Sequence, residues 1–436
     1  MVIGILDHMG YGNLGDAATQ DVAIANIRKR LPDVRLVGFS FIPHDTTERH
    51  GIPCYPIRWW YPRPAALGDR NTDGTISKSR LKSVLKSAPF IYRWAKLLHD
   101  FMHEALFWVR SYRVLRRLDL LIISGGGQLS DLWRGPWSHP YTIFKFCLLT
   151  KLAGKKVFFL NVGAGPLDHS LSKVFAKYAV QLADYRSFRD EDYEKLVRKL
   201  GVKAKTHVYP DMAYGLEVEE SSKSRPRAFS KPVVGINPIG FCDARIWVRK
   251  DEALYEQYLD KVVRFSLWLL EQGYNLRMFS TEISVDKYAL EDIQARLRSR
   301  VAPDILSQIF RTASKNVKDV LQEMSEFDFV VTSKYHGIIF SQVLGKPVIS
   351  LNYHRKMDFA MQAVGQDRFC AGIEHFSVDW LIDAFRSLAE ENGKTNPIAA
   401  AVVEKYAATL SRQFDELFIP ENASIATTPR SSLAVS

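Results

Sequence analysis

The sequence predicts an α/β protein of two domains, each built on a parallel sheet. The chain has 436 residues, which is too long for one ordinary hydrophobic core. Short apolar runs alternate with amphipathic helical patterns along most of its length, as they do in βαβ units. Glycines or ionisable residues follow several of these runs, at the strand ends where open α/β sheets bind ligands.

The composition is that of a globular protein with anionic partners. Hydrophobic residues make up 47% and charged residues 25% of the chain, and the formal net charge is +11. Such a charge suits phosphorylated substrates, acidic lipid headgroups or nucleic acid. No helix-turn-helix, zinc-finger or RNP-type signature accompanies it, so we do not expect nucleic acid binding. The nine tryptophans suit stacking on sugars or an interfacial surface.

Cysteine use and hydropathy both indicate a cytoplasmic enzyme. The four cysteines, Cys54, Cys147, Cys242 and Cys370, stand far apart without a CxxC pair. We therefore expect free thiols and no metal site. No signal peptide is evident, and no apolar stretch reaches the roughly 18 residues of a transmembrane helix.

The N-terminal domain is predicted over residues 1–220. Val2–Met9 is expected as a strand, and a helical pattern with apolar Val22, Ile24, Ile27 and Leu31 follows it. Between them lies Gly-Asn-Leu-Gly-Asp at residues 12–16. This turn could present backbone N–H groups to an anion, or it could be a tight turn in which Asp16 caps the helix.

A basic helical insertion is predicted at about residues 50–118. Residues 78–117 read as one or two helices, rich in lysine, arginine and aromatic residues. A basic, aromatic amphipathic helix is typical of an acidic membrane surface. The alternative is a helix that packs its apolar face on the domain and solvates its charges.

Three further predicted strands of this domain end in residues suited to ligands. The strand Asp119–Ser124 runs into Gly125-Gly126-Gly127, Lys156–Val162 into Gly163–Pro166, and Tyr185–Phe188 into Arg189-Asp190. Consecutive glycines allow a ligand to approach the backbone closely. The alternatives are plain turns for the glycines and a helix-start ion pair for Arg189-Asp190.

A polar, proline-containing linker, Glu219–Lys231, separates the C-terminal domain, predicted over residues 232–419. Strands are expected at Pro232–Asn237, Leu276–Ser280, Phe327–Val331 and Val348–Asn352, with an edge strand at Ser307–Phe310. The tail, residues 420–436, is rich in serine, threonine and alanine and is expected to be disordered.

The principal candidate site motif is Lys334-Tyr335-His336-Gly337, just after the predicted strand Phe327–Val331. Lys334 offers a point charge for an anion, and His336 can move a proton near neutral pH. The alternative is a strand end with a surface lysine and a hydrogen-bonded histidine. Several glycine-bearing strand ends in the other half of the chain favour the functional interpretation, with the motif as one wall of a cleft between the domains.

Taken in order, these stretches resemble the polysaccharide pyruvyl transferase family over about residues 2–360. The matching stretches are Gly12–Asp16, Gly125–Gly127, Gly163–Pro166, Arg189-Asp190, Pro210-Asp211, Lys334–Gly337, Gly345–Val348, Tyr353 and Lys356. The chain differs in having Lys334 where the family has arginine; lysine keeps the charge but lacks the bidentate fork. The basic insertion at 50–118 also departs from the family pattern.

The resemblance implies two Rossmann-like domains facing each other across a cleft, the GT-B arrangement. It also implies transfer of a pyruvyl group from phosphoenolpyruvate to a sugar or lipid-linked glycan. No metal-ligand cluster is evident in the sequence, so we expect no required metal, and we expect no cofactor beside the donor substrate. His336 is the candidate general acid or base, with Asp16 as second catalytic partner. The candidate substrate-binding residues are Lys334, Arg189, Lys356, Asn13, Gly15, Gly125, Gly126, Gly127, Gly337 and Tyr353.

Two other functions are compatible with the same residues. A GT-B glycosyltransferase would use the glycine turns to cradle a nucleotide-sugar diphosphate and Lys334 to neutralise it. A non-catalytic scaffold would bind an acidic membrane surface through residues 78–117. The polar strand ends argue against the scaffold, which has little need of them.

Overall fold

The structure is a computed structural model of the whole chain. It describes residues 1–6, 10, 12–60, 89–131, 135–218, 231–247, 249–311, 314–391 and 397–419. The contacts within the chain divide it into two units. The N-terminal unit comprises Met1–Gly10 and Leu31–Val208, and the C-terminal unit comprises Tyr11–Arg30 and Tyr209–Ser436.

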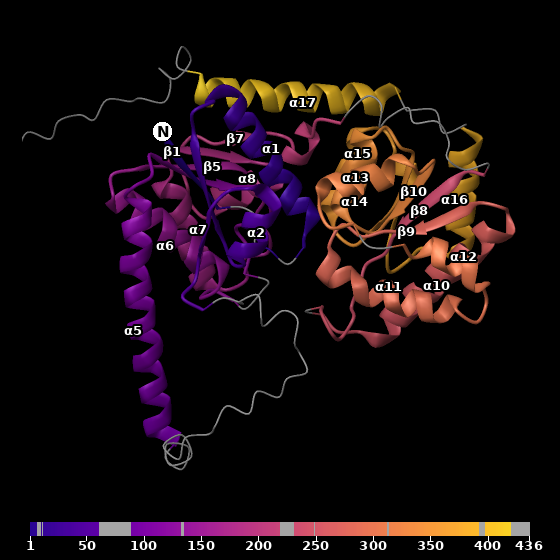
Figure 1. Cartoon of the computed structure of the whole chain (residues 1–436), viewed down its shortest axis with the longest axis horizontal. Coiled ribbons are helices and arrows are strands. Elements are labelled where there is room, and N and C mark those ends of the chain that lie inside the picture. Colours follow the sequence, from indigo (N-terminus) through magenta and orange to yellow (C-terminus); the bar gives the residue numbers. More distant parts are fainter. Residues whose placement is uncertain are drawn as a thin grey trace, which may run out of the picture. The chain divides into compact units, whose positions relative to one another are not determined.

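The N-terminal unit is built on a parallel sheet (Figure 1). The strand order of this sheet is β3-β2-β1-β4-β5-β6-β7. Its strands are β1 (Val2–Leu6), β2 (Arg35–Ser40), β3 (Cys54–Pro56), β4 (Leu120–Ser124), β5 (Lys156–Val162), β6 (Tyr185–Phe188) and β7 (His207–Val208). The helices that the structure describes in this unit are α2 (Pro43–His50), α5 (Pro89–Leu115), α6 (His139–Leu152), α7 (Ser170–Leu182) and α8 (Glu191–Lys199). Every residue of β4 is buried, as expected for a parallel strand covered on both faces.

The C-terminal unit is built on a second parallel sheet, with the order β12-β11-β10-β8-β9. Its strands are β8 (Val233–Asn237), β9 (Asn275–Met278), β10 (Phe329–Thr332), β11 (Val348–Asn352) and β12 (Cys370–Gly372). The helices that follow these strands are α10 (Glu252–Glu271), α11 (Ile283–Leu297), α12 (Pro303–Ile309), α13 (Val317–Ser325), α14 (Tyr335–Val343), α15 (Arg355–Ala363), η2 (Asp367–Phe369) and α16 (Val378–Glu390).

Within the described residues the C-terminal unit also includes the helices α1 (Leu14–Arg30), η1 (Met212–Gly215) and α17 (Pro397–Phe418). Arg30 joins α1 to α17, because its guanidinium lies 2.7 Å from Asp415 and donates to the carbonyl of Ser411 at 2.7 Å. The helix that follows β1 in sequence therefore has its contacts in the other unit. The predicted division into residues 1–220 and 232–419 places this helix in the N-terminal domain instead.

The strand order marks where each sheet can bind a ligand. In the C-terminal unit β8 comes first in the chain, β9 lies on one side of it and β10 on the other. Ligands of open α/β sheets bind outside the carboxyl ends of the strands at such a reversal. The loop after β10 carries Lys334 and His336. In the N-terminal unit the equivalent strands are β1 and β4, and β4 leads into Gly125–Gly127.

The predicted fold class is confirmed, with two α/β units on parallel sheets. The predicted edge strand at Ser307–Phe310 is wrong, since residues 303–309 form α12. Pro303 starts this helix, and Leu306 and Ile309, one turn apart, are buried. The part of the predicted basic helix before residue 89, most of the linker and the tail at 420–436 lie outside the described residues.

Among the helices that the structure describes, none combines the length and the apolar character needed to cross a bilayer.

Candidate functional site

Lys334 lies at the carboxyl end of β10 and is the N-cap residue of α14. Its amide donates to Oγ1 of Thr332 at 3.0 Å, and the amide of the preceding Ser333 donates to the carbonyl of Asn237, on β8, at 2.9 Å. These bonds fix the turn that leads from the sheet into α14. The Lys334 side chain is only 8% exposed.

Two carboxylates hold the Lys334 ammonium. Nζ lies 2.7 Å from Oε2 of Glu282 and 2.8 Å from Oδ1 of Asp286. Burial would lower the pKa of Lys334, but the charges of Asp286 and Glu282 outweigh it and raise the pKa above its usual range. Burial raises the pKa of the Asp286 carboxyl, and the Lys334 cation opposes this shift. The positive charge of Lys334 is therefore matched within the protein.

Our sequence reasoning missed Glu282 and Asp286, although a signal was present. They stand four residues apart, at the N-cap and in the first turn of the helix that follows β9, and residues at this spacing share one face of a helix. Asp286 is completely buried, and its Oδ2 accepts hydrogen bonds from Oγ of Ser280 at 2.8 Å and from the amide of Glu282 at 3.0 Å. A fully buried carboxylate with these partners organises the start of α11.

The Gly-Asn-Leu-Gly-Asp motif places the start of α1 against this same edge. The amide of Leu14 donates to the carbonyl of Thr281 at 2.9 Å, and the amide of Ile283 donates to the carbonyl of Gly12 at 2.9 Å. Gly12 has φ of +68°, a left-handed conformation that glycine adopts without strain. Asn13 and His336, both candidates from the sequence, are thereby brought into one unit.

Asn13 caps α1 with its side chain. Its Oδ1 accepts hydrogen bonds from the amides of Gly15 at 3.0 Å and Asp16 at 3.1 Å. With the Leu14 amide already bonded to Thr281, the first amides of α1 have partners within the protein. Of the two alternatives for this turn, the arrangement resembles a capped tight turn more than an anion cradle, with Asn13 and not Asp16 as the cap. The roles of Asn13, Gly15 and Asp16 toward substrate stay predictions.

His336 is half-buried and packs directly on α1. A β-carbon at Gly15 would lie 1.8 Å from its Nδ1, so only glycine permits this approach. On its other sides the imidazole contacts the rings of Tyr335, at 5.3 Å between centroids, and Phe340, at 6.1 Å. Its position is therefore set by α1 and α14 together.

Gly337 allows α14 to begin close to the sheet. A β-carbon there would lie 2.1 Å from Oγ1 of Thr332 and 3.0 Å from Oδ1 of Asn237. Gly337 is buried, and the close packing of these two side chains explains why residue 337 is a glycine. Its predicted contact with substrate stays a prediction.

Tyr353 lies in the loop after β11, and Lys356 lies in the first turn of α15. Nζ of Lys356 lies 4.9 Å from the centroid of the Tyr335 ring, the same ring that contacts His336. Tyr353 packs edge-to-face on Trp247, with ring centroids 5.6 Å apart. Lys356 is half-buried. The C-terminal unit thus holds a second cation, Lys356, one aromatic ring away from His336.

The N-terminal unit carries the remaining predicted residues at the carboxyl edge of its own sheet. Gly125 and Gly126 have φ of +55° and +46°, and the amide of Gly163 donates to the carbonyl of Gly126 at 2.8 Å. The guanidinium of Arg189 lies against Gly163, where a β-carbon would come within 2.6 Å of Nε. Arg189 also stacks on Tyr193, 5.3 Å from its ring centroid. The structure therefore brings Arg189 to the glycine turns, while a β-carbon at Gly127 would meet open space.

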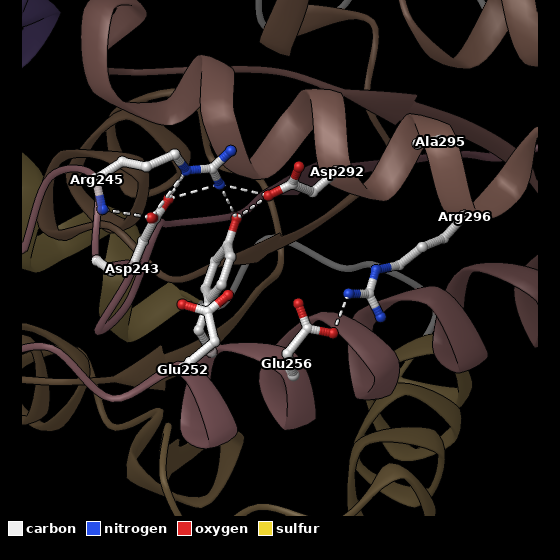
Figure 2. Close-up of a pocket in the computed structure, with 9 residues that line it drawn as sticks. Asp243, Arg245, Glu252, Glu256, Asp292, Ala295 and Arg296 are labelled. Atoms are coloured by element: carbon white, nitrogen blue, oxygen red, sulfur yellow. Dashed lines mark hydrogen bonds and ion pairs between the residues drawn. The ribbon is translucent and has the colours of Figure 1, made fainter.

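A pocket of about 530 Å³ lies beside α10 and α11 in the C-terminal unit (Figure 2). It contains none of the residues predicted from the sequence. Arg245 bonds Asp243 at 2.7 Å and also bonds Asp292, and Tyr255 donates to Asp292 at 2.6 Å. The hydrogen bond to Asp243, and after it the one to Asp292, raise the pKa of Arg245. Because these charges satisfy one another, we interpret the network as a structural tie between the two helices.

No group of three or more histidine, cysteine, aspartate or glutamate side chains in the described part of the chain is placed to hold a metal ion.

Solved structures similar to this chain share its fold at low sequence identity. Alr3699/HepE of Anabaena, in complex with UDP, matches with 13% identity and a TM-score of 0.53, over 97% of this chain and 99% of its own. The UDP-GlcNAc 2-epimerase of Methanocaldococcus jannaschii matches with 10% identity and a TM-score of 0.54, over 94% and 100%. MnaA of S. aureus with UDP matches with 11% identity and a TM-score of 0.56, over 99% of both chains. These proteins have GT-B type folds, so the fold is shared.

At the level of sequence, no curated protein matches this chain significantly. The family model described as polysaccharide pyruvyl transferase matches residues 13–355, from Asn13 of the glycine turn to the residue before Lys356. This span includes His336, Arg189 and the glycine turns of both units. The chain therefore belongs to the polysaccharide pyruvyl transferase family and is an enzyme of that class.

Proposed function

We propose that this enzyme transfers a pyruvyl group from phosphoenolpyruvate to a sugar of a cell-surface or exopolysaccharide precursor, where it forms a ketal. Membership of the family supports pyruvylation of a polysaccharide; the donor and the acceptor are our proposal. The observation that carries it is the position of His336. It lies at the carboxyl edge of the C-terminal sheet, next to the strand-order reversal, between Gly15 of α1 and Tyr335.

The reaction needs one proton delivered and two removed. Protonation of the methylene carbon of phosphoenolpyruvate makes it a methyl group and leaves the adjacent carbon electrophilic. One sugar hydroxyl attacks that carbon and a second hydroxyl displaces phosphate, and both lose their protons. One of these two protons replaces the one given to the methylene carbon, and the other leaves with the phosphate. The equation balances without an oxidant or a reductant.

His336 is our general acid or base for these proton transfers, because imidazole exchanges protons near neutral pH. Asp16, half-buried in the first turn of α1, is one residue beyond the glycine that His336 contacts, and we assign it the second catalytic role. General acid–base catalysis by one group contributes roughly 10²- to 10⁴-fold to the rate.

For the anionic groups of the donor we assign Lys356 the leading role in the C-terminal unit. Lys334 has the two carboxylates Glu282 and Asp286 within 2.8 Å, so a phosphate there would have to compete with both. Lys356 shares the Tyr335 ring with His336. We therefore assign Lys334 to positioning the turn before His336. In the N-terminal unit Arg189 remains our candidate anion ligand, and its guanidinium can grip a carboxylate or a phosphate bidentately.

A nucleotide-sugar is the alternative donor, and a specific observation favours it. The solved structures similar to this chain include complexes with UDP and with UDP-GlcNAc. At 9–13% identity the likeness concerns the fold, which does not fix the donor. The family match covers the motif residues themselves, so we place phosphoenolpyruvate first.

Release of phosphate tests the proposal. Purified enzyme is incubated with phosphoenolpyruvate and a set of nucleotide-activated or lipid-linked glycans, and inorganic phosphate is measured. We expect phosphate release with at least one acceptor and a loss of at least about 10²-fold in His336→Ala. His375→Ala, the same change at an exposed histidine of the same unit, is the control and keeps the wild-type rate. Wild-type turnover in His336→Ala would remove His336 from the mechanism.

A further inference from the structure

The helix α5 presents a continuous apolar face to solvent. Its 27 residues run from Pro89 to Leu115. Large apolar side chains between residues 94 and 109 are exposed by 49–71%, and we call them the apolar face of α5: Trp94, Leu97, Leu98, Phe101, Met102, Leu106 and Val109. Soluble proteins rarely expose contiguous apolar surface of this kind without a partner.

The spacing of these residues places them on one side of the helix. Counted from Trp94 they follow at 3, 4, 7, 8, 12 and 15 residues, which is the pattern of a single apolar stripe. At 1.5 Å per residue the stripe is about 22 Å long. The opposite side carries Arg93, Lys96, His99, Asp100 and His103. The result is a helix with one wide apolar side and one polar side on which basic residues predominate.

Contacts of three other side chains of α5 tie the helix to the rest of its unit. His103 stacks on Trp59, with ring centroids 5.1 Å apart. Glu104 accepts hydrogen bonds from Nζ of Lys145 at 2.8 Å and from Oη of Tyr141 at 2.9 Å, both on α6. Trp108 donates to the same Tyr141 hydroxyl at 2.8 Å. The helix is therefore fixed to the unit while the face stays exposed.

The C-terminal part of α5 packs against the core of the unit. Phe107 and Leu115 are buried there, at 6% and 0% exposure. Figure 1 shows this part of the helix beside α6 and the rest of α5 extending beyond it. The core of the unit thus accounts for Phe107 and Leu115, and it leaves the apolar face unexplained.

We propose that the apolar face of α5 binds a membrane surface containing anionic phospholipids. The charges of α5 and of the two residues after it support this partner. The exposed cations of residues 89–117 are Arg93, Lys96, Arg110, Arg113, Arg116 and Arg117. Asp100 and Glu104 are the acidic residues of this segment, and Glu104 is paired with Lys145. An amphipathic helix with tryptophan and leucine on one side and basic residues on the other lies in the lipid–water interface, and each cation near an acidic bilayer adds to the attraction.

A second copy of the chain fits this face less well. Two apolar faces packed on each other would bring the same arginines and lysines together, and like charges oppose association. An anionic bilayer offers the opposite charge and an apolar interior at once. The proposal therefore commits to lipid. It goes beyond the proposed reaction and does not depend on which donor the enzyme uses.

Vesicle flotation of the full chain tests the proposal. Vesicles of phosphatidylcholine alone are compared with vesicles that also contain phosphatidylglycerol. We expect the wild type to float with the anionic vesicles and much less with the neutral ones, and high salt to weaken this binding.

Variants assign the binding to α5. The double variant Leu98→Glu, Phe101→Glu replaces two exposed apolar residues by a good helix former, so the helix is retained. We expect it to lower the vesicle partition coefficient at least about tenfold. Ile305→Glu, the same kind of change at a residue 41% exposed on α12, is the matched control and binds as the wild type does.

Three outcomes would overturn the proposal. The wild type could fail to float with anionic vesicles, or the double variant could bind them as well as the wild type. The wild type could also be a dimer that the double variant dissociates, measured by analytical ultracentrifugation, in which case a second copy covers the face. Because flotation needs no substrate, its failure is distinct from a failure to release phosphate from phosphoenolpyruvate.

Discussion

The imidazole of His336 packs against Gly15 so closely that a β-carbon at residue 15 would lie 1.8 Å from Nδ1. The helix that carries Gly15 cannot simply move away. Its first amide, on Leu14, is bonded to the carbonyl of Thr281, and Asn13 caps the next two. A glycine motif near the start of the chain thus positions a histidine more than 300 residues later.

Gly15→Ala is expected to impair the proposed reaction through His336. The added methyl group must displace the imidazole or α1, so turnover should fall by about 10²- to 10⁴-fold, the contribution of a positioned acid or base. Gly372→Ala is the control, because its β-carbon would meet only Cδ2 of His375 at 3.6 Å. Steady-state phosphate release compares the two. Equal activity of Gly15→Ala and the wild type would contradict the assignment.

Lys334→Met is expected to destabilise the fold. It leaves Asp286, which is fully buried, without its cation, and breaking a buried ion pair in this way costs about 3–5 kcal/mol. The double variant Lys334→Met, Asp286→Asn should recover part of this loss, because the amide is neutral. Urea unfolding measures both. A Lys334→Met protein of normal stability that no longer binds the donor would show instead that Lys334 is an anion ligand.

Acid should weaken the N-terminal unit through His139. Burial, and then the charge of Arg58, lower the pKa of His139 to about 3, while in the unfolded chain its pKa is near 6.5. Below pH 6.5, His139 therefore binds a proton in the unfolded chain but stays neutral in the native state. Stability falls as the pH drops from about 6.5 toward 3, by up to about 1.4 kcal/mol per pH unit for this one group.

The variant His139→Gln isolates this contribution. Its unfolding free energy should fall less steeply than that of the wild type between pH 6.5 and 5, measured by urea unfolding at each pH. The amide can still donate to Oε1 of Gln128, which lies 2.7 Å from Nε2 of His139. Parallel pH profiles for the two proteins would show that His139 titrates normally in the native state.

Local sequence patterns predicted the sheets well. The strands Lys156–Val162 and Tyr185–Phe188 were predicted with their observed ends. The first is a largely apolar run that ends before Gly163, and the second is a short stretch between Asp184 and the Arg189-Asp190 start of the next helix. The short edge strands β3 and β12 were missed, since three residues are too few to show a period. The error at Ser307–Phe310 has the same cause.

Long-range pairing explains what the sequence could not show. The partners of Lys334 are 52 and 48 residues away, at the N-cap and in the first turn of α11, and nothing in the local pattern of Lys334 distinguishes a buried ion pair from an anion site. The same holds for α5. Its periodicity predicted an amphipathic helix, but whether the domain covers Phe101 is decided by tertiary packing, and the structure leaves it 71% exposed.

Donor binding tests the central claim most directly. Thermal unfolding of the purified enzyme is recorded with phosphoenolpyruvate and, separately, with UDP-GlcNAc, since a ligand that binds the native state raises the midpoint. We predict that phosphoenolpyruvate raises the midpoint in a concentration-dependent way, and that UDP-GlcNAc does not. Stabilisation by UDP-GlcNAc without any response to phosphoenolpyruvate would contradict pyruvyl transfer and favour a nucleotide-sugar as the donor.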